Sequence, residues 1–377
     1  MKRKRAGSDQ FKGGKLLLGA VAEKVERAIV SGEFAVGDMI PPERYLAEHC
    51  KVSRVTVRSA LVLLEKDGLL ERFPRIGYKV VRRLRSDLLR RPVGVIEEGF
   101  RGVASLPLRI EAFERLLCDS DRAMMLGVTG CDAERENACI RRFREAGAAG
   151  LIVTPARFGQ RSSALEEWIR DRAPVVLEGH PGAWLLSDEL AARCSRTDVD
   201  NRDGVFQVMH YLLNMGHRRM GMLCGDDPRH SERLAAFREF TSRNDLPVEP
   251  EWEVTGMGWK RAGGHIGFRR MAAAASMPTA VICTQDDLAL GLLDAARAAG
   301  LTCPGDLSVV GFSNESSEGR DRLRELTTVG WSVELAAREA LLLLDEQMDG
   351  DCEPRTVKIP VELIVRNSCA PPAGNGA

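Results

Sequence analysis

Residues 29–72 read IVSGEFAVGDMIPPERYLAEHCKVSRVTVRSALVLLEKDGLLER, and this stretch predicts two short helices joined by a tight turn. The first begins near residues 41–43 (PPE), because proline is favoured in the first turn of a helix and an acid is stabilised near its positive end. Ser53 can cap the second helix, which runs from residue 54 to about residue 67. Apolar side chains recur along that helix at helical spacing, which predicts an inward face made of Val57, Ala60, Leu61 and Leu64.

The neighbouring residues complete a small module. Apolar positions at helical spacing predict a preceding helix over residues 16–30, and residues 69–72 and 78–81 predict a β-hairpin. Arg54 and Arg58 lie four residues apart, so they share one face of the second short helix. This pair of short helices, the second beginning with exposed arginines, has helix-turn-helix geometry. In that geometry the first turn of the second helix enters the major groove of DNA.

The residue types at the start of this helix suit DNA. An arginine can bond both acceptors of a guanine, and serine or threonine can reach phosphates or bases. A hairpin beside the helix is a wing that can touch the adjacent groove. The alternative is that the two arginines only form a solvated basic face.

The motifs S-G-E…G-D, P-x-E-R-x-L-A, V-S-R-x-T-V-R-x-A-L and L-E-x-x-G-L-L-E-R resemble the GntR-family winged helix over residues 15–81. The resemblance implies that Gly77 is the wing glycine. Residues 73–76 (FPRI) replace the Gly/Arg-rich wing tip of the family, which leaves Arg75 as the candidate contact there. The other DNA contacts that the resemblance implies are Arg44, Ser53, Arg54, Thr56 and Arg58.

Charge is distributed unevenly along a chain whose net charge is zero. Residues 1–91 hold 21 Lys/Arg against 11 Asp/Glu, whereas the remaining residues hold 33 against 43. A basic N-terminal part joined to an acidic body indicates a nucleic-acid-binding module fused to a second function. Residues 82–91 (RRLRSDLLRR) are predicted to be a basic linker between them.

Several classes of protein are disfavoured by composition. The ten cysteines are scattered without any C-x-x-C pair, so we expect free thiols in a reducing cytoplasm and neither a zinc site nor a disulfide framework. No apolar run approaches the roughly 18 residues of a membrane helix. The basic N-terminus is not followed by an apolar signal-peptide core. We therefore expect a cytoplasmic protein that needs no cofactor.

The body, residues 92–368, shows a different pattern. Short β-branched runs alternate with helical stretches, which predicts an α/β fold with parallel sheets. A strand–helix series begins at residue 93 and a similar one begins at residue 220, so we expect two doubly wound lobes with a cleft at the carboxyl ends of their strands. The predicted strands cover residues 93–96, 124–128, 151–153, 175–177, 220–224, 280–283 and 307–311.

The segments LLNMGHRRMGMLCGD, PTAVICTQDDLALGLLDAARAAGL and PGDLSVVGFSN resemble the LacI/ribose-binding-protein sensor domain. That resemblance implies the two-lobed periplasmic-binding-protein fold. A GntR-type winged helix on such a body resembles the arabinose-repressor subgroup of GntR regulators. The effector-binding residues that the resemblance and the position of the first strand suggest are Arg233, Trp259, Gln285, Ser313, Phe100 and Glu98.

The chemistry of these positions suits a hydroxyl-rich ligand. Arg233 offers five rigid donors and Trp259 a flat apolar surface. Ser313 stands where the family often has Asp, which removes a charged acceptor for hydroxyls. Glu97 and Glu98 follow the first strand, and because they are adjacent we expect at most one of them to face the cleft as a ligand group. The acids there would either compensate for the acceptor lost at Ser313 or favour a cationic or amino ligand. Alternatively, Arg233 pairs with an acid and Trp259 is ordinary packing.

The parts together predict a ligand-responsive transcriptional regulator, a repressor by resemblance. It would bind a palindromic operator as a homodimer and take a sugar-like effector in the cleft. An enzyme on the α/β body is the alternative from another class, but we find no G-x-S-x-G, Walker A or H-E-x-x-H motif. The third hypothesis is a DNA-binding protein whose body binds no effector.

Overall fold

The structure is a computed structural model, and its chain divides into two compact units, Met1–Arg91 and Pro92–Ala377. Each unit is described by itself. The structure describes residues 18–22, 24–25, 28–29, 34–35, 37–66, 69–74, 76–81, 91–99, 106–156, 161–179, 186–226, 230–258, 260–316, 323–350 and 353–373. The predicted linker, apart from Arg91, lies outside these residues.

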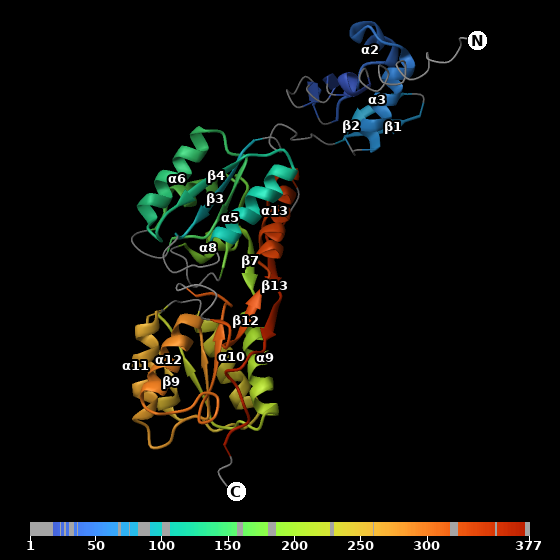
Figure 1. Ribbon diagram of the computed structural model, residues 1–377. Coiled ribbons are helices and arrows are strands. Elements are labelled where there is room, and N and C mark those ends of the chain that lie inside the picture. The colour runs from blue at the N-terminus through green and yellow to red at the C-terminus, as the bar shows by residue number, and fades with distance from the viewer. Residues whose placement is uncertain are drawn as a thin grey trace, which may run out of the picture. The chain divides into compact units, whose positions relative to one another are not determined.

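The N-terminal unit contains the predicted pair of helices and the hairpin (Figure 1). Helix α2 (Glu43–Cys50) ends at Lys51, whose left-handed backbone turns the chain toward α3 (Arg54–Lys66). Strands β1 (Leu70–Phe73) and β2 (Gly77–Val80) pair antiparallel. The predicted inward face of α3 is confirmed, because its buried residues are Val57, Ala60, Leu61 and Leu64.

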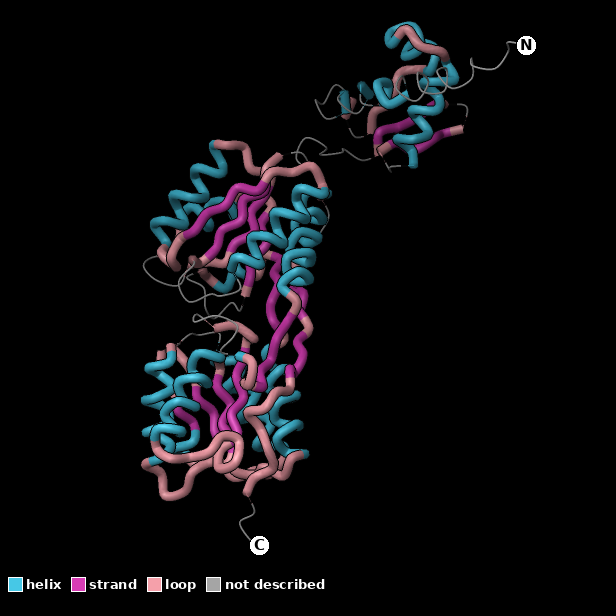
Figure 2. The backbone as a smooth tube through the Cα atoms, in the orientation of Figure 1, coloured by secondary structure: helices cyan, strands magenta, loops and turns pink. Residues whose placement is uncertain are grey.

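The second unit contains two six-stranded sheets, each with helices on both faces (Figure 2). In the first lobe every strand pair is parallel, and the strand order is β13-β7-β6-β5-β3-β4. The bounds are β3 (Val93–Glu97), β4 (Met124–Val128), β5 (Gly150–Val153), β6 (Val175–Glu178), β7 (Ser195–Val199) and β13 (Thr356–Ile359). The helices are α5 (Leu106–Asp119), α6 (Ala133–Glu145), α7 (Ser163–Arg170), α8 (Asp188–Ala191) and α13 (Val333–Asp349).

The second lobe has the strand order β14-β12-β11-β10-β8-β9, and only the β12–β14 pair is antiparallel. Its strands are β8 (Met220–Leu223), β9 (Glu253–Val254), β10 (Ala280–Cys283), β11 (Ser308–Phe312), β12 (Thr327–Trp331) and β14 (Val361–Ile364). The helices are α9 (Asn201–Asn214), α10 (His230–Arg243), α11 (Arg261–Ala272) and α12 (Asp286–Ala298), with a 3₁₀ turn at Pro250–Trp252.

The seven strands predicted in the body are present, and five others were missed: β7, β9, β12, β13 and β14. The predicted parallel sheets are confirmed, and among the described strand pairs of the body only β12 and β14 run antiparallel. The chain passes between the lobes three times in the described residues: after β7, after β12, and between β13 and β14 (Figure 1). These crossings bring strand ends and helix starts of both lobes to one place.

Candidate functional site

The start of α3 is the candidate DNA-binding surface. The Ser53 hydroxyl caps the helix by accepting a hydrogen bond from the Thr56 backbone N–H at 3.1 Å, and it lies 2.8 Å from the Thr56 hydroxyl. The cap holds these two predicted contacts together beside Arg54, which is exposed. Val55, between them, is 73% exposed. The first turn of α3 thus presents a cation, two hydroxyls and one apolar side chain to solvent.

Arg58 has a partner that the sequence pattern did not indicate. Its guanidinium donates to the carboxylate of Glu43 on α2, with Nη2–Oε2 at 2.7 Å, and this bond lowers the pKa of Glu43. The Arg58 side chain is still 64% exposed. An exposed pair of this kind contributes little to stability, so a phosphate or a base edge can replace Glu43 at small cost.

The other predicted DNA contacts lie at different places on the module. Arg44 on α2 is exposed and reaches Glu48 one turn later, at 3.5 Å. Gly77 begins β2 with a φ of 138°, a backbone conformation that side chains of L residues rarely adopt. Arg75, at the tip of the hairpin, lies outside the described residues.

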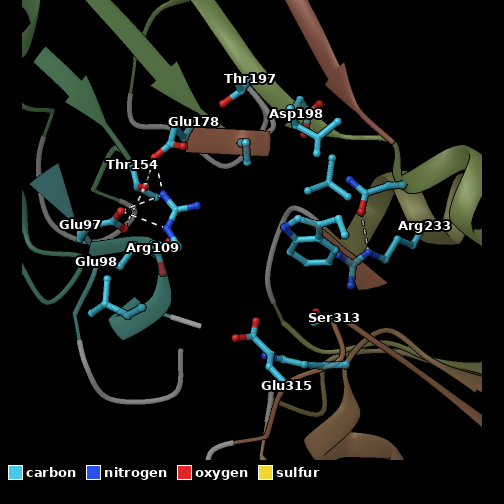
Figure 3. Close-up of a pocket in the computed structure, with 18 of the residues that line it drawn as sticks. Glu97, Glu98, Arg109, Thr154, Glu178, Thr197, Asp198, Arg233, Ser313 and Glu315 are labelled. Carbon is cyan, nitrogen blue, oxygen red and sulfur yellow. Dashed lines mark hydrogen bonds and ion pairs between the residues drawn. The ribbon is translucent and has the colours of Figure 1, made fainter. Parts of the chain in front are cut away.

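A cavity of about 150 Å³ lies between the two lobes of the body, at the carboxyl ends of β3, β6 and β7 and beside the start of α9 (Figure 3). Four predicted effector residues line it: Glu98 from the first lobe, and Arg233, Gln285 and Ser313 from the second. Phe100 and Trp259 lie outside the described residues.

The first-lobe wall of the cavity is built on a shared guanidinium. Arg109 on α5 donates from Nη2 to Glu97 Oε1 at 2.8 Å, and the same nitrogen donates to Glu178 at the end of β6. The Thr154 hydroxyl lies 3.5 Å from both carboxylates. Burial, opposed in part by Arg109, raises the pKa of Glu97 to about 7. Figure 3 shows these four side chains grouped on one side of the cavity.

Glu98 also lines this wall, so the expectation that only one of the adjacent acids faces the cleft is wrong. The simple alternation of a strand does not continue, because β3 ends at Glu97 and Gly99 turns the chain with a φ of 143°. Glu98 is buried, and its Oε2 accepts from the Cys131 thiol at 3.7 Å.

The second-lobe wall holds Arg233 rigidly. Its Nε donates to Asn201 Oδ1 at 2.7 Å, and its Nη1 donates to the Thr284 carbonyl oxygen. The guanidinium carbon lies 3.7 Å from the centre of the Phe312 ring, and the residue is only 6% exposed. Stacking and two neutral acceptors therefore fix the direction of this cation toward the cavity.

Two further predicted residues complete this wall. Ser313 has a φ of 105°, unusual for a residue with a side chain, and its N–H donates to the Val329 carbonyl. Such strained positions concentrate at binding sites. The side-chain oxygen Oε1 of Gln285 is buried and has no hydrogen-bond partner among the described residues. It is an acceptor that a ligand can satisfy.

Asp286 follows Gln285 but does not line the cavity. It is fully buried, and it accepts from the Thr328 hydroxyl at 2.5 Å and from the Glu315 N–H at 2.8 Å. Burial raises its pKa to about 7. Its role is to hold the loop after β11, which carries Ser313, against the end of α12.

Sequence reasoning missed Arg109, Glu178 and Trp331, all of which line the cavity. Trp331 ends β12 at one of the crossings between the lobes, and it offers the flat apolar surface that was assigned to Trp259. An aromatic residue directly before the helix-capping Ser332 was the available signal.

Other functional classes were considered for the described part of the chain. It contains no cluster of three or more His, Cys, Asp or Glu side chains arranged to hold a metal ion. Of the helices described, none combines the length and apolarity needed to cross a membrane.

Two family models match the chain. Residues 17–80 match the model of bacterial regulatory proteins of the gntR family, and residues 209–369 match that of the periplasmic binding protein-like domain. The arabinose metabolism transcriptional repressor of Geobacillus stearothermophilus is 27% identical over 348 residues, which cover 90% of this chain and 94% of that protein.

Other relatives match the body. The HTH-type transcriptional repressor PurR of Escherichia coli is 27% identical over 265 residues, 69% of this chain and 75% of that protein. A solved LacI transcriptional regulator from a Rhodococcus species superposes with a TM-score of 0.62 at 20% identity, over 74% of this chain and 98% of that chain. This last likeness concerns the fold.

The helix-turn-helix and hairpin, the two lobes and the family models agree with one another. The relatives that match most of the chain are transcriptional regulators. This chain joins a GntR-family winged helix-turn-helix domain to a periplasmic-binding-protein-like domain, and it is a DNA-binding transcriptional regulator with a ligand-binding domain.

Proposed function

We propose that this regulator is a cytoplasmic repressor that binds a palindromic operator as a homodimer and releases it when a small hydroxyl-rich effector occupies the cavity between the lobes. The observation that carries this proposal is the cavity itself, which both lobes line and into which Arg233 is held by Asn201 and Thr284. A ligand that bridges both walls favours the conformation in which they are close.

The DNA-binding part of the proposal rests on the first turn of α3. Arg54 and Thr56 lie where a recognition helix meets base edges, and Arg44 and Arg58 lie where they can reach phosphates. Arg58 would exchange Glu43 for DNA, since both members of that pair are at the surface. Gly77 and Arg75 belong to the wing, which we propose to contact the adjacent groove.

The effector-binding part rests on the complementary walls of the cavity. Arg233 and Gln285 supply a fixed donor set and an open acceptor, and Trp331 supplies a flat face for a ring. We propose that the body binds its ligand without transforming it. Coupling between the cavity and the operator is reciprocal, so DNA must weaken effector binding by the same factor by which the effector weakens DNA binding.

DNA binding is tested by fluorescence anisotropy with the full chain and a duplex from the region beside its own gene. We expect sequence-selective binding that weakens steeply with salt. Arg54→Ala should cost about 1–3 kcal/mol of specific binding. Arg270→Ala, at an exposed site on α11, is the matched control and should leave binding unchanged.

Effector binding is tested on the same duplex with a panel of sugars, polyols and amino sugars. One class of compound should raise the unfolding temperature of the protein and lower its affinity for the operator. Absence of selective DNA binding would remove the regulator function. Turnover of a panel compound by purified protein would favour the enzyme instead.

A further inference from the structure

Among the described residues that line the cavity, acids outnumber bases. Five carboxyl side chains face two guanidiniums, Arg109 and Arg233. The acids are Glu97, Glu98, Glu178, Asp198 and Glu315. Lys358, outside the lining, lies 2.9 Å from Asp198. Asp198 therefore already has a cationic partner, whereas Glu97 and Glu178 are two carboxyl groups that share the one guanidinium of Arg109.

The excess is concentrated on the first-lobe wall. Glu97 and Glu178 share the single guanidinium of Arg109, and both carboxylates are almost entirely buried. Burial and the proximity of Glu178 both disfavour the charged form of Glu97. A second cation at this wall would relieve that repulsion, because one guanidinium balances only one of the two negative charges.

The opposite wall supplies an independent observation. The Gln285 oxygen is a buried acceptor without a partner in the described part of the chain, and it needs an N–H or O–H donor from the ligand. Trp331 lines the cavity close to the crossing between the lobes and offers contact with a carbon ring. The ligand therefore needs donors at both walls and one apolar face.

We infer that the effector is a protonated amine on a polyhydroxylated ring, the chemistry of an amino sugar, with its ammonium group at Glu97 and Glu178 and its hydroxyls toward Arg233 and Gln285. This inference rests on the proposed function and specifies the class of effector for the same cavity. The cavity of about 150 Å³ admits one small polar molecule rather than an oligomer.

Neutral and anionic ligands fit this cavity less well. An acid or a phosphate ester would bring negative charge against the carboxylates of the first-lobe wall. A neutral hexose would exclude water from the two carboxylates but add no positive charge beside Arg109. Burying a charge without a counterion costs free energy, so such a ligand should bind less tightly. An ammonium group makes charge-assisted hydrogen bonds at the same place.

The test compares ligands that differ in one group. D-Glucosamine, D-galactosamine and D-mannosamine are each titrated into the full chain beside the parent hexose and the N-acetyl derivative, by calorimetry and by thermal shift. At least one amine should bind ten-fold or more tightly than both of its neutral counterparts. Its affinity should fall with added salt, because the attraction is between charges.

A variant locates the ammonium group. Glu97→Gln keeps an oxygen that can accept from Arg109 while it removes one charge, so the preference for the amine over the parent hexose should fall about ten-fold. Glu178→Gln provides a second variant of the same pair, and Glu239→Gln, in an exposed pair on α10, is the control that should keep the preference.

Each other result overturns the inference. Equal or tighter binding of a parent hexose or a sugar acid would show that the acid excess does not select a cation, although the regulator function would stand. Failure of every amine to bind would also remove the inference, while the operator titration would still decide the proposed function. An amine preference that survives in both glutamine variants would place the ammonium elsewhere.

Discussion

The two lobes share an architecture, but their walls at the cavity differ in chemistry. The first-lobe wall is ionic, with Arg109 between Glu97 and Glu178. The second-lobe wall orients a single cation, Arg233, with neutral acceptors and the ring of Phe312. Similar sheets can thus present a charge-selective surface on one side of a ligand and a directional hydrogen-bonding surface on the other.

Each lobe also buries a carboxyl whose pKa is raised to about 7, and the two differ in how they are satisfied. Asp286 accepts two hydrogen bonds from its own lobe and lies away from the cavity lining. Glu97 depends on a guanidinium that it shares and lies in the lining. The first is a structural acid, and the second is available to a ligand.

The largest effect should come from removing the shared cation. Arg109→Ala leaves two buried carboxylates without a counterion, and we expect it to cost about 3–5 kcal/mol of unfolding free energy at pH 8. Urea unfolding measures this. Arg202→Ala breaks an exposed pair with Glu239 and should lower the free energy of unfolding far less. Similar costs for the two variants would show that the first-lobe wall is not ionic in the sense described.

A smaller effect is expected on the second wall. Arg233→Ala should weaken the effector by about 1.5–3 kcal/mol, the value of hydrogen bonds to a charged group. Operator binding without effector should be retained. Calorimetry with the amine that binds and anisotropy with the operator separate the two quantities. Arg238→Ala, an exposed arginine of α10, is the control, and an unchanged effector response in Arg233→Ala would contradict the placement of the site.

Replacing the structural acid Asp286 by its amide should lower the stability of the protein more than replacing the cavity acid Glu97 by its amide. Asp286→Asn puts an N–H₂ group opposite one of two donors, the Thr328 hydroxyl and the Glu315 N–H, and should cost about 1–3 kcal/mol at neutral pH. Glu97→Gln should cost less, because one oxygen can accept from Arg109. Paired thermal melts at pH 7 compare them. A larger loss in Glu97→Gln would reverse the assignment of roles.

The last effect, which is smallest when expressed per pH unit, concerns pH. The pKa of Glu97 rises from an ordinary value of 4.5 to about 7, so the folded chain binds more protons than the unfolded chain between these values. The free energy of unfolding must therefore fall as pH rises through that window, by at most about 1.4 kcal/mol per pH unit for one proton.

This slope should be shallower in Glu97→Gln than in the parent protein, with the part due to Asp286 remaining. Unfolding temperatures measured from pH 5 to pH 8 test it. A bound amine favours the ionised carboxylate, so its affinity should weaken as pH falls through about 7. Parallel slopes for variant and parent would show that Glu97 titrates no differently in the folded and unfolded chains.

Sequence patterns predicted the strands whose own residues form a clear apolar run. The buried strands β3, β5, β6, β8 and β10 are apolar, apart from the glutamate that ends β3 and β6, and were predicted. By contrast, β7 (SRTDV) and β13 (TVKI) mix polar and apolar residues. Those two strands pair at the edge of the first sheet and take their conformation from each other, which no single segment reveals.

The residues of the site also divide into those that sequence motifs predicted and those that were missed. Arg233, Gln285 and Ser313 were found because the second lobe carries recognisable motifs, and they line one wall. Arg109 was missed because it is one charge among several on α5, and its partners are 12 and 69 residues away. The first-lobe wall could not be predicted from the sequence, because its residues meet only when the fold brings α5, β3 and β6 together.

Strands β13 and β14 lie in different sheets and only Pro360 separates them. The first lobe also needs α13, which ends at residue 349, although most of its sheet is encoded before residue 200. During synthesis, the first lobe therefore cannot be completed until residue 359 has left the ribosome, long after β7, which ends at residue 199. A message truncated before residue 356 would lose both strands and yield two incomplete halves instead of one sound and one damaged half.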